Sequence, residues 1–477
     1  MQSPNENPFR VDRFGAMPDG GTPCTAGIQQ AIDAAAAARG GVVTFPKGRY
    51  LTGALFVKSH VELHLDDGVE LMGVQDETAY PEIWSRVAGI EMRWPSALIN
   101  VYEQTAVRIT GPGMINGQGE FWWNKYWGPD ERGGMLKDYE TKGLRWAADY
   151  DCQRPRLILV YKSTNVLLEK LHLRRSPFWT VHICYSQNIT IDGIVIRENL
   201  GPSSDGIDID SSSDVLVQRC DIDCNDDALC LKAGRDADGL RVNRPTENVV
   251  MRDCVVHAGH GLFTIGSETS GGVRNVEVCQ MKALGTWIGV SFKSARTRGG
   301  IVEGIRIHDI EMVGVPRPFR FTLNWLPSYS YPQLPKDWRG ELPEHWKVLT
   351  QPVLPPERGI PEFRRISIRN VTVKDGQRTA AQGAPSSSVM MHTPDVLNSL
   401  AFDIEAHPEK PMRRLTWENV TIEAGSAGAI AHARDWTMNN VTVRTPDGAP
   451  VRMENCENVP MPRMEKASPA GSRAPAT

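Results

Sequence analysis

A short pattern of apolar residues recurs along the middle of this chain and constrains its fold more than any other feature. Each copy has a polar or glycine residue, followed by apolar residues one, three and six positions later. Six copies begin at Asn165, Asn188, Asp214, Asn248, Asn275 and Gly304, 23 to 34 residues apart. A repeat of this length is typical of a solenoid, in which each copy packs on its neighbours.

The repeats predict an all-β fold, a right-handed parallel β-helix with one coil per repeat. Alternating β-branched residues favour strands, and the segments between copies lack the helix-length periodicity of a βαβ fold. Neighbouring coils of such a stack lie about 4.8 Å apart. The last apolar residue of each copy is then expected in one inward-facing ladder: Leu171, Ile194, Cys220, Cys254, Met281 and Ile310.

The repeats also predict a single domain over residues 1–460. Its N-terminal cap, about 8–60, contains a helix expected over Cys24–Gly41, because a solenoid needs a cover for its first coil. Two long, irregular, Trp-rich inserts are expected at about 120–156 and 321–363. Residues 461–477 are poor in apolar residues and are expected to form a disordered tail.

The charge composition argues against several classes of partner. The chain has 53 Lys+Arg and 57 Asp+Glu, a net charge of −4, and no polybasic run, so neither nucleic acid nor an anionic membrane surface is expected. The sequence has no apolar stretch near the roughly 18 residues of a membrane helix. Its first residues lack the pattern of a signal peptide. Nine Cys without a CxxC pair or zinc spacing predict no structural metal.

A second apolar pair recurs once per coil and aligns the coils independently: Val181/Ile183, Ile207/Ile209, Leu229/Leu231, Phe263/Ile265 and Val290/Phe292. With each pair facing inward, the residue between its members faces outward. One outward column is then His182, Asp208, Cys230, Thr264 and Ser291. The alignment predicts that charged residues of four coils share one face: Asp205, Asp208, Asp210, Asp226, Asp227, Lys232, His260 and Lys293.

Five carboxylates on one face indicate acid–base chemistry. Crowded carboxylates raise one another's pKa, so that one of them is expected to hold a proton near neutral pH. A protonated carboxyl beside ionised ones is what cleavage of a glycosidic bond requires. Two other interpretations stay open: oxygen ligands from adjacent coils also suit Ca²⁺, and carboxylates on strands can simply be solvated.

Four ordered motifs on this face resemble those of glycoside hydrolase family 28, the polygalacturonase family of pectin-degrading enzymes, and in particular its bacterial exo-type members. They are SSDGID at 203–208, NDDALCLKAG at 225–234, GHGLFTIGS at 259–267 and SFKS at 291–294. Further similarity upstream extends the resemblance over most of the chain, from Pro8 to Val443.

The resemblance implies roles for particular residues. Asp226 would be the general acid, while Asp205 and Asp227 would hold and activate water, with inversion and without a metal or cofactor. His260 would support the acid cluster and the sugar ring, and Lys293 would bind a galacturonate carboxylate. Further candidates for substrate binding are Asp208, Lys232, Arg235 and His182. The implied substrate is a pectic poly- or oligosaccharide, which favours a periplasmic or secreted enzyme.

One departure from the family motif keeps the substrate open. Ser291 stands where the family has an arginine, whose bidentate grip on a carboxylate serine cannot reproduce. Candidate replacements are Lys232, Arg235, Arg296 and Arg298. The long inserts favour exo action. Alternatives are a rhamnogalacturonan hydrolase, a Ca²⁺-dependent pectate lyase and a non-catalytic carbohydrate-binding β-helix.

Overall fold

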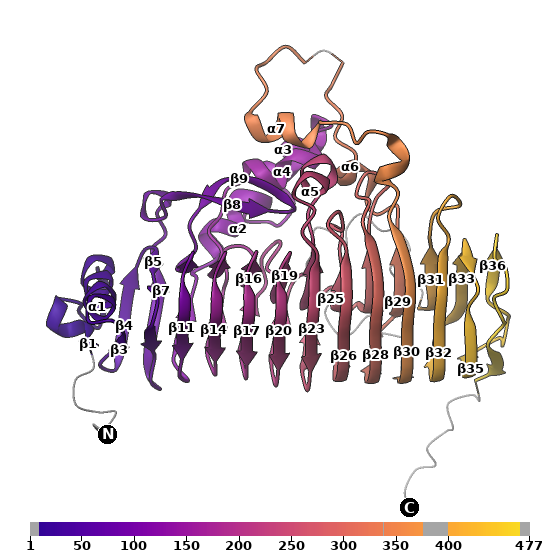
Figure 1. Ribbon diagram of the computed structural model, residues 1–477, viewed down its shortest axis with the longest axis horizontal. Helices are drawn as coiled ribbons and strands as arrows, with labels where there is room; N and C mark the ends of the chain where they lie inside the picture. The colour runs from indigo at the N-terminus through magenta and orange to yellow at the C-terminus, as the bar shows by residue number, and fades with distance from the viewer. Residues whose placement is uncertain (1–8, 337, 375–398, 468–477) are drawn as a thin grey trace, which may run out of the picture.

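The computed structural model describes residues 9–336, 338–374 and 399–467. Its strands stack side by side along one long axis, coil upon coil, as a parallel β-helix (Figure 1). The inward ladder predicted from the repeats is buried, with Leu171 and Cys254 fully inaccessible and Ile310 only 3% exposed. The predicted all-β parallel β-helix is therefore confirmed.

One face of the coils is a 12-stranded parallel sheet. Its strands are β5 (Leu55–Phe56), β10 (Ile99–Tyr102), β13 (Ile158–Tyr161), β16 (Val181–Cys184), β19 (Ile207–Asp210), β22 (Leu229–Lys232), β25 (Gly261–Ile265), β27 (Ile288–Lys293), β29 (Arg317–Thr322), β31 (Leu400–Glu405), β33 (Ser426–Ala431) and β36 (Arg452–Glu454). The register is the predicted one, since Ile207 pairs with Val181 on one side and with Leu229 on the other.

The other strands of the coils form a 23-stranded sheet that carries the repeats. They are β1 (Phe9–Arg10), β2 (Asp19–Pro23), β3 (Gly41–Thr44), β4 (Gly48–Thr52), β6 (Val61–His64), β7 (Val69–Gly73), β11 (Thr105–Thr110), β12 (Met114–Asn116), β14 (Thr164–Glu169), β15 (His172–Arg174), β17 (Gln187–Asp192), β18 (Val195–Asn199), β20 (Ser213–Gln218), β21 (Asp221–Cys224), β23 (Thr246–Arg252), β24 (Val255–Ala258), β26 (Val273–Leu284), β28 (Ile301–Val313), β30 (Glu362–Lys374), β32 (Met412–Glu423), β34 (Ala433–Arg434), β35 (Thr437–Thr445) and β37 (Arg463–Lys466).

The structure explains why a polar residue stands at the start of most repeats. Asn248 and Asn275 have φ of 55° and 52°, in the left-handed region that Asn tolerates better than most residues. Their side chains also stack from coil to coil, because the Asn275 amide donates a 2.7 Å hydrogen bond to the Asn248 side-chain oxygen. The repeat thus marks the same bend in each coil.

A helix, α1 (Thr25–Ala37), lies within the segment predicted to be helical, and the short 3₁₀ helix η1 (Val11–Phe14) precedes it. Figure 1 shows α1 at the N-terminal end of the stack. Its buried face, which includes Ile28 and Ile32, joins the hydrophobic core of the coils.

The prediction that the inserts are irregular is wrong, because both contain helices. The first insert forms α2 (Glu120–Trp127), α3 (Gly134–Thr141) and α4 (Arg145–Asp151); the second contains α6 (Pro327–Ser330), α7 (Glu344–Leu349) and the 3₁₀ helix η3 (Pro356–Gly359). These helices are too short to give a periodic sequence signal. Mutual packing of aromatic rings stabilises them, as where Trp146 meets Trp346 at 4.9 Å between ring centroids.

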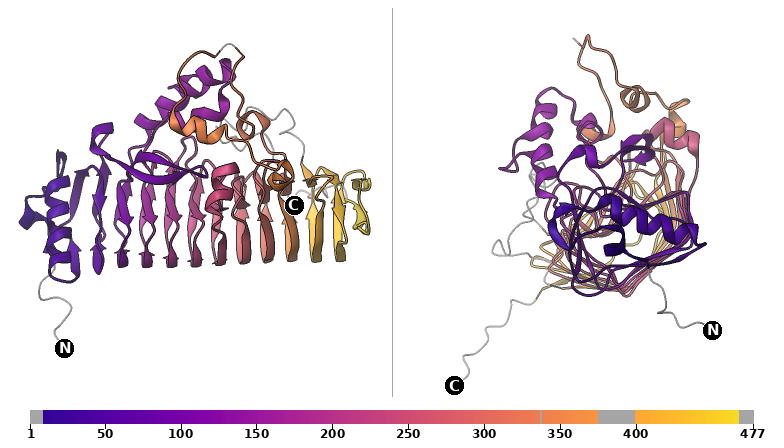
Figure 2. Two further views of the ribbon diagram at one scale, coloured as in Figure 1. Left: turned by 45° about the horizontal axis from the view of Figure 1, so that its top comes forward. Right: turned by 90° about the vertical axis from the view of Figure 1, so that its left-hand side faces the viewer.

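Two further elements of this region were not predicted. An antiparallel hairpin joins β8 (Glu82–Val87) to β9 (Ile90–Pro95), and the segment after β22 contains helix α5 (Asp236–Val242). The hairpin shares a hydrophobic cluster with both inserts, to which Trp94 contributes. Figures 1 and 2 show hairpin and helices gathered above the middle coils of the stack.

The C-terminal boundary also needs correction. Strand β37 lies inside the predicted tail, yet it pairs in parallel with β35, so that Met464 lies beside Val443. Backbone hydrogen bonds can add a strand even where few side chains are apolar. The rest of the predicted tail, 468–477, lies outside the described residues. Within the described part of the chain, every helix is too short or too polar to traverse a bilayer.

Candidate active site

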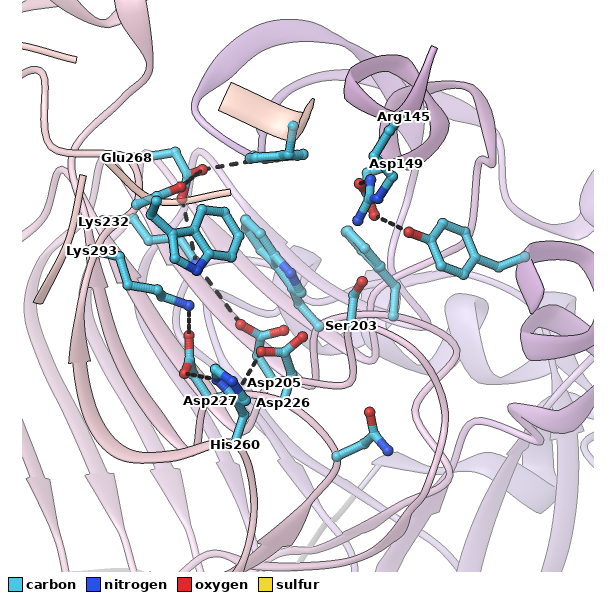
Figure 3. A pocket seen from close by; sticks show the side chains of 18 residues that line it. Arg145, Asp149, Ser203, Asp205, Asp226, Asp227, Lys232, His260, Glu268 and Lys293 are labelled. Carbon is cyan, nitrogen blue, oxygen red and sulfur yellow. Dashed lines mark hydrogen bonds and ion pairs between the residues drawn. The ribbon is translucent and has the colours of Figure 1, made fainter. Parts of the chain in front are cut away.

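A cavity lies between the coils and the inserted elements (Figure 3). Its floor comes from the coils: Phe178, Trp179, Ser203, Asp205, Asn225, Asp226, Asp227, Lys232, His260, Ser267, Glu268 and Lys293. Its roof comes from the hairpin and the two inserts: Ala88, Tyr126, Arg145, Asp149, Trp325 and Tyr329. The structure therefore places six of the nine predicted site residues on one surface.

Adjacent coils bring together three carboxylates of the floor, Asp205, Asp226 and Asp227, here called the aspartate cluster. Asp205 lies two residues before β19 and Asp227 two residues before β22, the equivalent places predicted from the apolar pairs. One carboxylate oxygen of Asp227 lies within 4.8 Å of an oxygen of Asp205. An oxygen of Asp227 also lies within 4.8 Å of an oxygen of Asp226.

Asp227 is held in its ionised form. The Lys293 ammonium lies 2.6 Å from one of its oxygens, and the Thr264 hydroxyl donates a 2.9 Å hydrogen bond to the other. The His260 ring nitrogen lies 3.5 Å away. Burial alone would raise the pKa of Asp227, but the charge of Lys293 and the hydrogen bond from His260 bring that pKa far below its usual range.

Asp205 has the opposite electrostatic environment. It is 3% exposed, and its nearest cation, Lys232, is 3.8 Å away. Burial, followed by the charges of Asp208 and Asp226, raises its pKa well above the ordinary value. The raised pKa of Asp205 favours its protonated form, while its neighbour Asp227 stays ionised.

Asp226 is the cluster member that is most open to the cavity. It is partly exposed, whereas Asp205 and Asp227 are buried. One of its oxygens accepts a 2.9 Å hydrogen bond from the backbone N–H of Asp227, which fixes the carboxyl group. The same residue's carbonyl accepts the N–H of His260 at 2.9 Å, so Asp226 and His260 lie on adjacent coils as predicted.

Two lysines form the wall beside the cluster. The Lys232 ammonium lies 3.5 Å from Asp208 and 3.6 Å from Glu268. Each lysine also faces an indole ring at 4.8 Å, Lys232 over Trp179 and Lys293 over Trp325. Burial favours the neutral form of Lys232, yet its anionic surroundings raise its pKa well above normal. Both lysines thus remain cations at the cavity.

The structure places His182 and Asp208 beneath the cavity instead of on its surface. Both are fully buried. The His182 ring lies 2.8 Å from the Arg156 guanidinium and 3.5 Å from Asp210, and burial lowers its pKa to about 4. Arg86, from the β8–β9 hairpin, reaches Asp210 at 3.1 Å. These outward-facing residues are therefore covered by chain from elsewhere, and Asp208 contacts the site through Lys232.

Arg235 is likewise buried and away from the cavity surface. It donates 2.7 Å hydrogen bonds to the Tyr150 hydroxyl and the Tyr329 carbonyl, so it supports the roof from behind. Of the other candidates to replace the family arginine, Arg298 is buried against Asp236, and Arg296 pairs with Glu409 at the surface. Only Lys232 among the four candidates lines the cavity.

Several residues of the cavity were missed by the sequence reasoning. The roof contributes Arg145, Asp149 and Tyr126, and the floor contributes Glu268. The enrichment of the inserts in aromatic residues was the only signal for the roof. No repeat or motif pointed to Arg145.

The cluster also offers oxygen and nitrogen atoms with the spacing of metal ligands. One set is Asp226, Asp227 and His260, within 4.8 Å of one another. The Lys293 ammonium, however, already lies 2.6 Å from Asp227 and supplies a positive charge there. A second cation at this position would meet electrostatic repulsion from Lys293.

The fold and the cavity define a β-helix protein with a carboxylate cluster on the outside of its coils. Residues 44–328, more than half of the chain, match the model of glycosyl hydrolases family 28. The chain belongs to this family, as its motifs indicated.

Individual relatives agree with the family match. A probable polygalacturonase of Vitis vinifera is 31% identical over 323 residues, 65% of this chain and 62% of the relative. An exo-poly-α-D-galacturonosidase of Dickeya chrysanthemi is 25% identical over 62% of this chain and 54% of the relative. The matched part is thus less than two thirds of either relative. The crystal structure of a hyperthermoactive exopolygalacturonase from Thermotoga maritima superposes with a TM-score of 0.70 and 25% identity, over 96% of this chain and 93% of that one.

Proposed function

We propose that this protein is an exo-acting glycoside hydrolase that cleaves α-galacturonosyl linkages of pectin or its oligosaccharides by an inverting mechanism without a metal. The observation that carries the proposal is the contrast within the aspartate cluster. Asp227 is ionised beside Lys293, while the raised pKa of Asp205 favours a protonated carboxyl in the same cluster. Glycosidic cleavage needs both a proton donor and an ionised carboxylate.

Asp226 acts as the general acid in this proposal, since it is the most exposed carboxyl group of the aspartate cluster. When Asp226, in its protonated form, gives its proton to the leaving oxygen, Asp205 and Asp227 hold the attacking water, and the ionised Asp227 accepts the proton of that water. His260, next to Asp227, orients the base.

A uronic acid substrate fits the charges of the cavity. Lys232, Lys293 and Arg145 line it together, and a carboxylated sugar pairs with such groups better than a neutral one does. The roof favours exo action, because the inserts cover the middle coils, where an endo-acting enzyme needs a cleft open at both ends. A pectic substrate would place the enzyme in the periplasm or outside the cell, which fractionation of the producing cells checks.

Product analysis tests the proposal and its alternatives together. Purified protein is incubated with tri- and tetragalacturonate and with rhamnogalacturonan oligomers, with EDTA present and absorbance at 235 nm recorded. Release of saturated monogalacturonate is the expected result. A product absorbing at 235 nm that EDTA abolishes would mean a Ca²⁺-dependent lyase. Cleavage of rhamnogalacturonan alone would reassign the substrate, and binding without turnover would remove the enzymatic function.

A further inference from the structure

We propose that Arg145, on the roof of the cavity, recognises the carboxylate of a uronosyl unit. The inference rests on the proposed function and names the residue that selects its substrate class. Arg145 is the first residue of α4 in the first insert. Figure 3 shows its guanidinium across the cavity from the aspartate cluster.

The position of Arg145 suits a residue that meets incoming substrate. Besides the main cavity, Arg145 borders a second depression between α4 and α6, whose wall also includes Pro327 and Tyr331. It therefore lies where the space above the aspartate cluster approaches the outer surface of the inserts. Its side chain is 14% exposed, so a ligand can reach it in a site that is largely shielded from water.

The guanidinium of Arg145 is held in place, yet not all of its N–H donors are engaged. The Nη1 of Arg145 donates a 2.5 Å hydrogen bond to one Asp149 oxygen. The Tyr126 hydroxyl donates a 2.8 Å hydrogen bond to the other oxygen of Asp149. The guanidinium also lies over the Tyr329 ring, 5.5 Å from its centroid. Among the described residues, Asp149 is its only hydrogen-bond acceptor. An arginine has five N–H donors in a planar fork, so donors remain for a bidentate grip on a carboxylate.

The other cations of the cavity are already engaged by the floor. Lys293 contacts Asp227 at 2.6 Å, and Lys232 is shared among three carboxylates. The position where the family has an arginine is Ser291 in this chain, 1% exposed and outside the cavity lining. Arg145 thus supplies, from an unrelated part of the chain, the planar cation that the floor lacks.

The test compares binding of galacturonate and of neutral galactose, measured by titration calorimetry. The proteins are the wild type, Arg145→Gln, Arg145→Lys and the control Arg296→Gln, which removes an arginine outside the cavity. We expect Arg145→Gln to weaken galacturonate binding about tenfold to a hundredfold, the range for a hydrogen bond to a charged group, and to leave galactose binding unchanged. Arg145→Lys should lose part of this affinity, and Arg296→Gln none.

Two results would overturn the inference: unchanged galacturonate binding in Arg145→Gln, or equal weakening of both sugars. If Arg145→Gln does not fold, as judged by its melting curve, the affinity of Arg145→Lys for galacturonate tests the inference. Lysine can keep an ion pair with Asp149 but lacks the planar N–H donors of a guanidinium. Titration calorimetry measures binding and does not depend on turnover. An inactive wild type with an Arg145-dependent preference for galacturonate would contradict only the proposed hydrolysis, whereas an active enzyme without that preference would contradict only this inference.

Discussion

The floor and the roof of the cavity are held in place by different forces. Backbone ladders between coils fix the floor, so that residues such as Asp205 and Asp227 are spaced by the coil repeat itself. Side-chain packing holds the roof, through an apolar cluster shared by the hairpin and both inserts. Under the proposed function, the floor performs the chemistry and the roof selects the substrate.

The largest effect should come from removing the acid of the floor. Asp226→Asn keeps the shape of the side chain and an oxygen for the Asp227 N–H, but it cannot protonate a leaving group. We expect kcat on trigalacturonate to fall at least about a hundredfold, the lower end for general acid–base catalysis, with KM changed little. The matched control is Asp223→Asn on the same coil, outside the cavity. A kcat within a few-fold of the wild type would remove Asp226 from this role.

A smaller effect should follow from removing the cation that ionises Asp227. In Lys293→Met the pKa of Asp227 should rise, since an opposite charge at this distance lowers a carboxyl pKa by about 1–3 units. The base is then protonated at higher pH, so the acid limb of the kcat/KM profile should move upward and activity at acidic pH should fall about tenfold or more. Lys282→Met, which removes a lysine at the surface, is the control. An unmoved acid limb would show that Lys293 does not tune the base.

A change in the roof should act mainly on binding. Trp325 lines the cavity with its ring over Lys293, where it can pack against a sugar. We expect Trp325→Ala to raise KM about fivefold to tenfold, consistent with the worth of one aromatic contact, and to change kcat less. Trp84→Ala, in an exposed position of the hairpin, should match the wild type. A loss confined to kcat would break the proposed division between floor and roof.

The last effect falls on the stability of the floor and leaves its chemistry aside. Burial, with further repulsion from Asp227 and Asp226 that Lys232 partly offsets, raises the pKa of Asp208 to about 7. Its folded state therefore binds a proton more tightly than the unfolded state does. The resulting stabilisation is full below about pH 4 and is lost as the pH rises through about 7. Asp208→Asn should remove this loss of stability with rising pH. Melting temperatures between pH 4.5 and 8.5 test it, and parallel curves for variant and wild type would contradict it.

The same contrast explains what the sequence could predict. Apolar pairs such as Ile207/Ile209 must stack inside the coils, so they fixed the register and brought Asp205, Asp226 and Asp227 together in advance. Strand alternation also predicted that Asp208 faces outward. Alternation could not reveal that Arg86, more than a hundred residues earlier, belongs to a hairpin that covers the neighbouring outward residue Asp210.

The roof was beyond this kind of reasoning for a physical reason. Arg145 belongs to an insert without a repeat, so no neighbouring coil sets its position. Its place depends on long-range aromatic packing, such as the contact of Trp146 with Trp346. A pattern of residue types within one segment carries no signal for a partner two hundred residues away.

The most direct test of the central claim is the configuration of the first product. Proton NMR follows the hydrolysis of an α-linked oligogalacturonide by the wild type during the first minutes, before the free sugar equilibrates between its anomers. If Asp226 protonates the leaving oxygen while Asp205 and Asp227 direct water to the opposite face, the first product is β-galacturonate. An initial α-anomer would contradict this account, since it would require one of these carboxylates to attack the sugar directly.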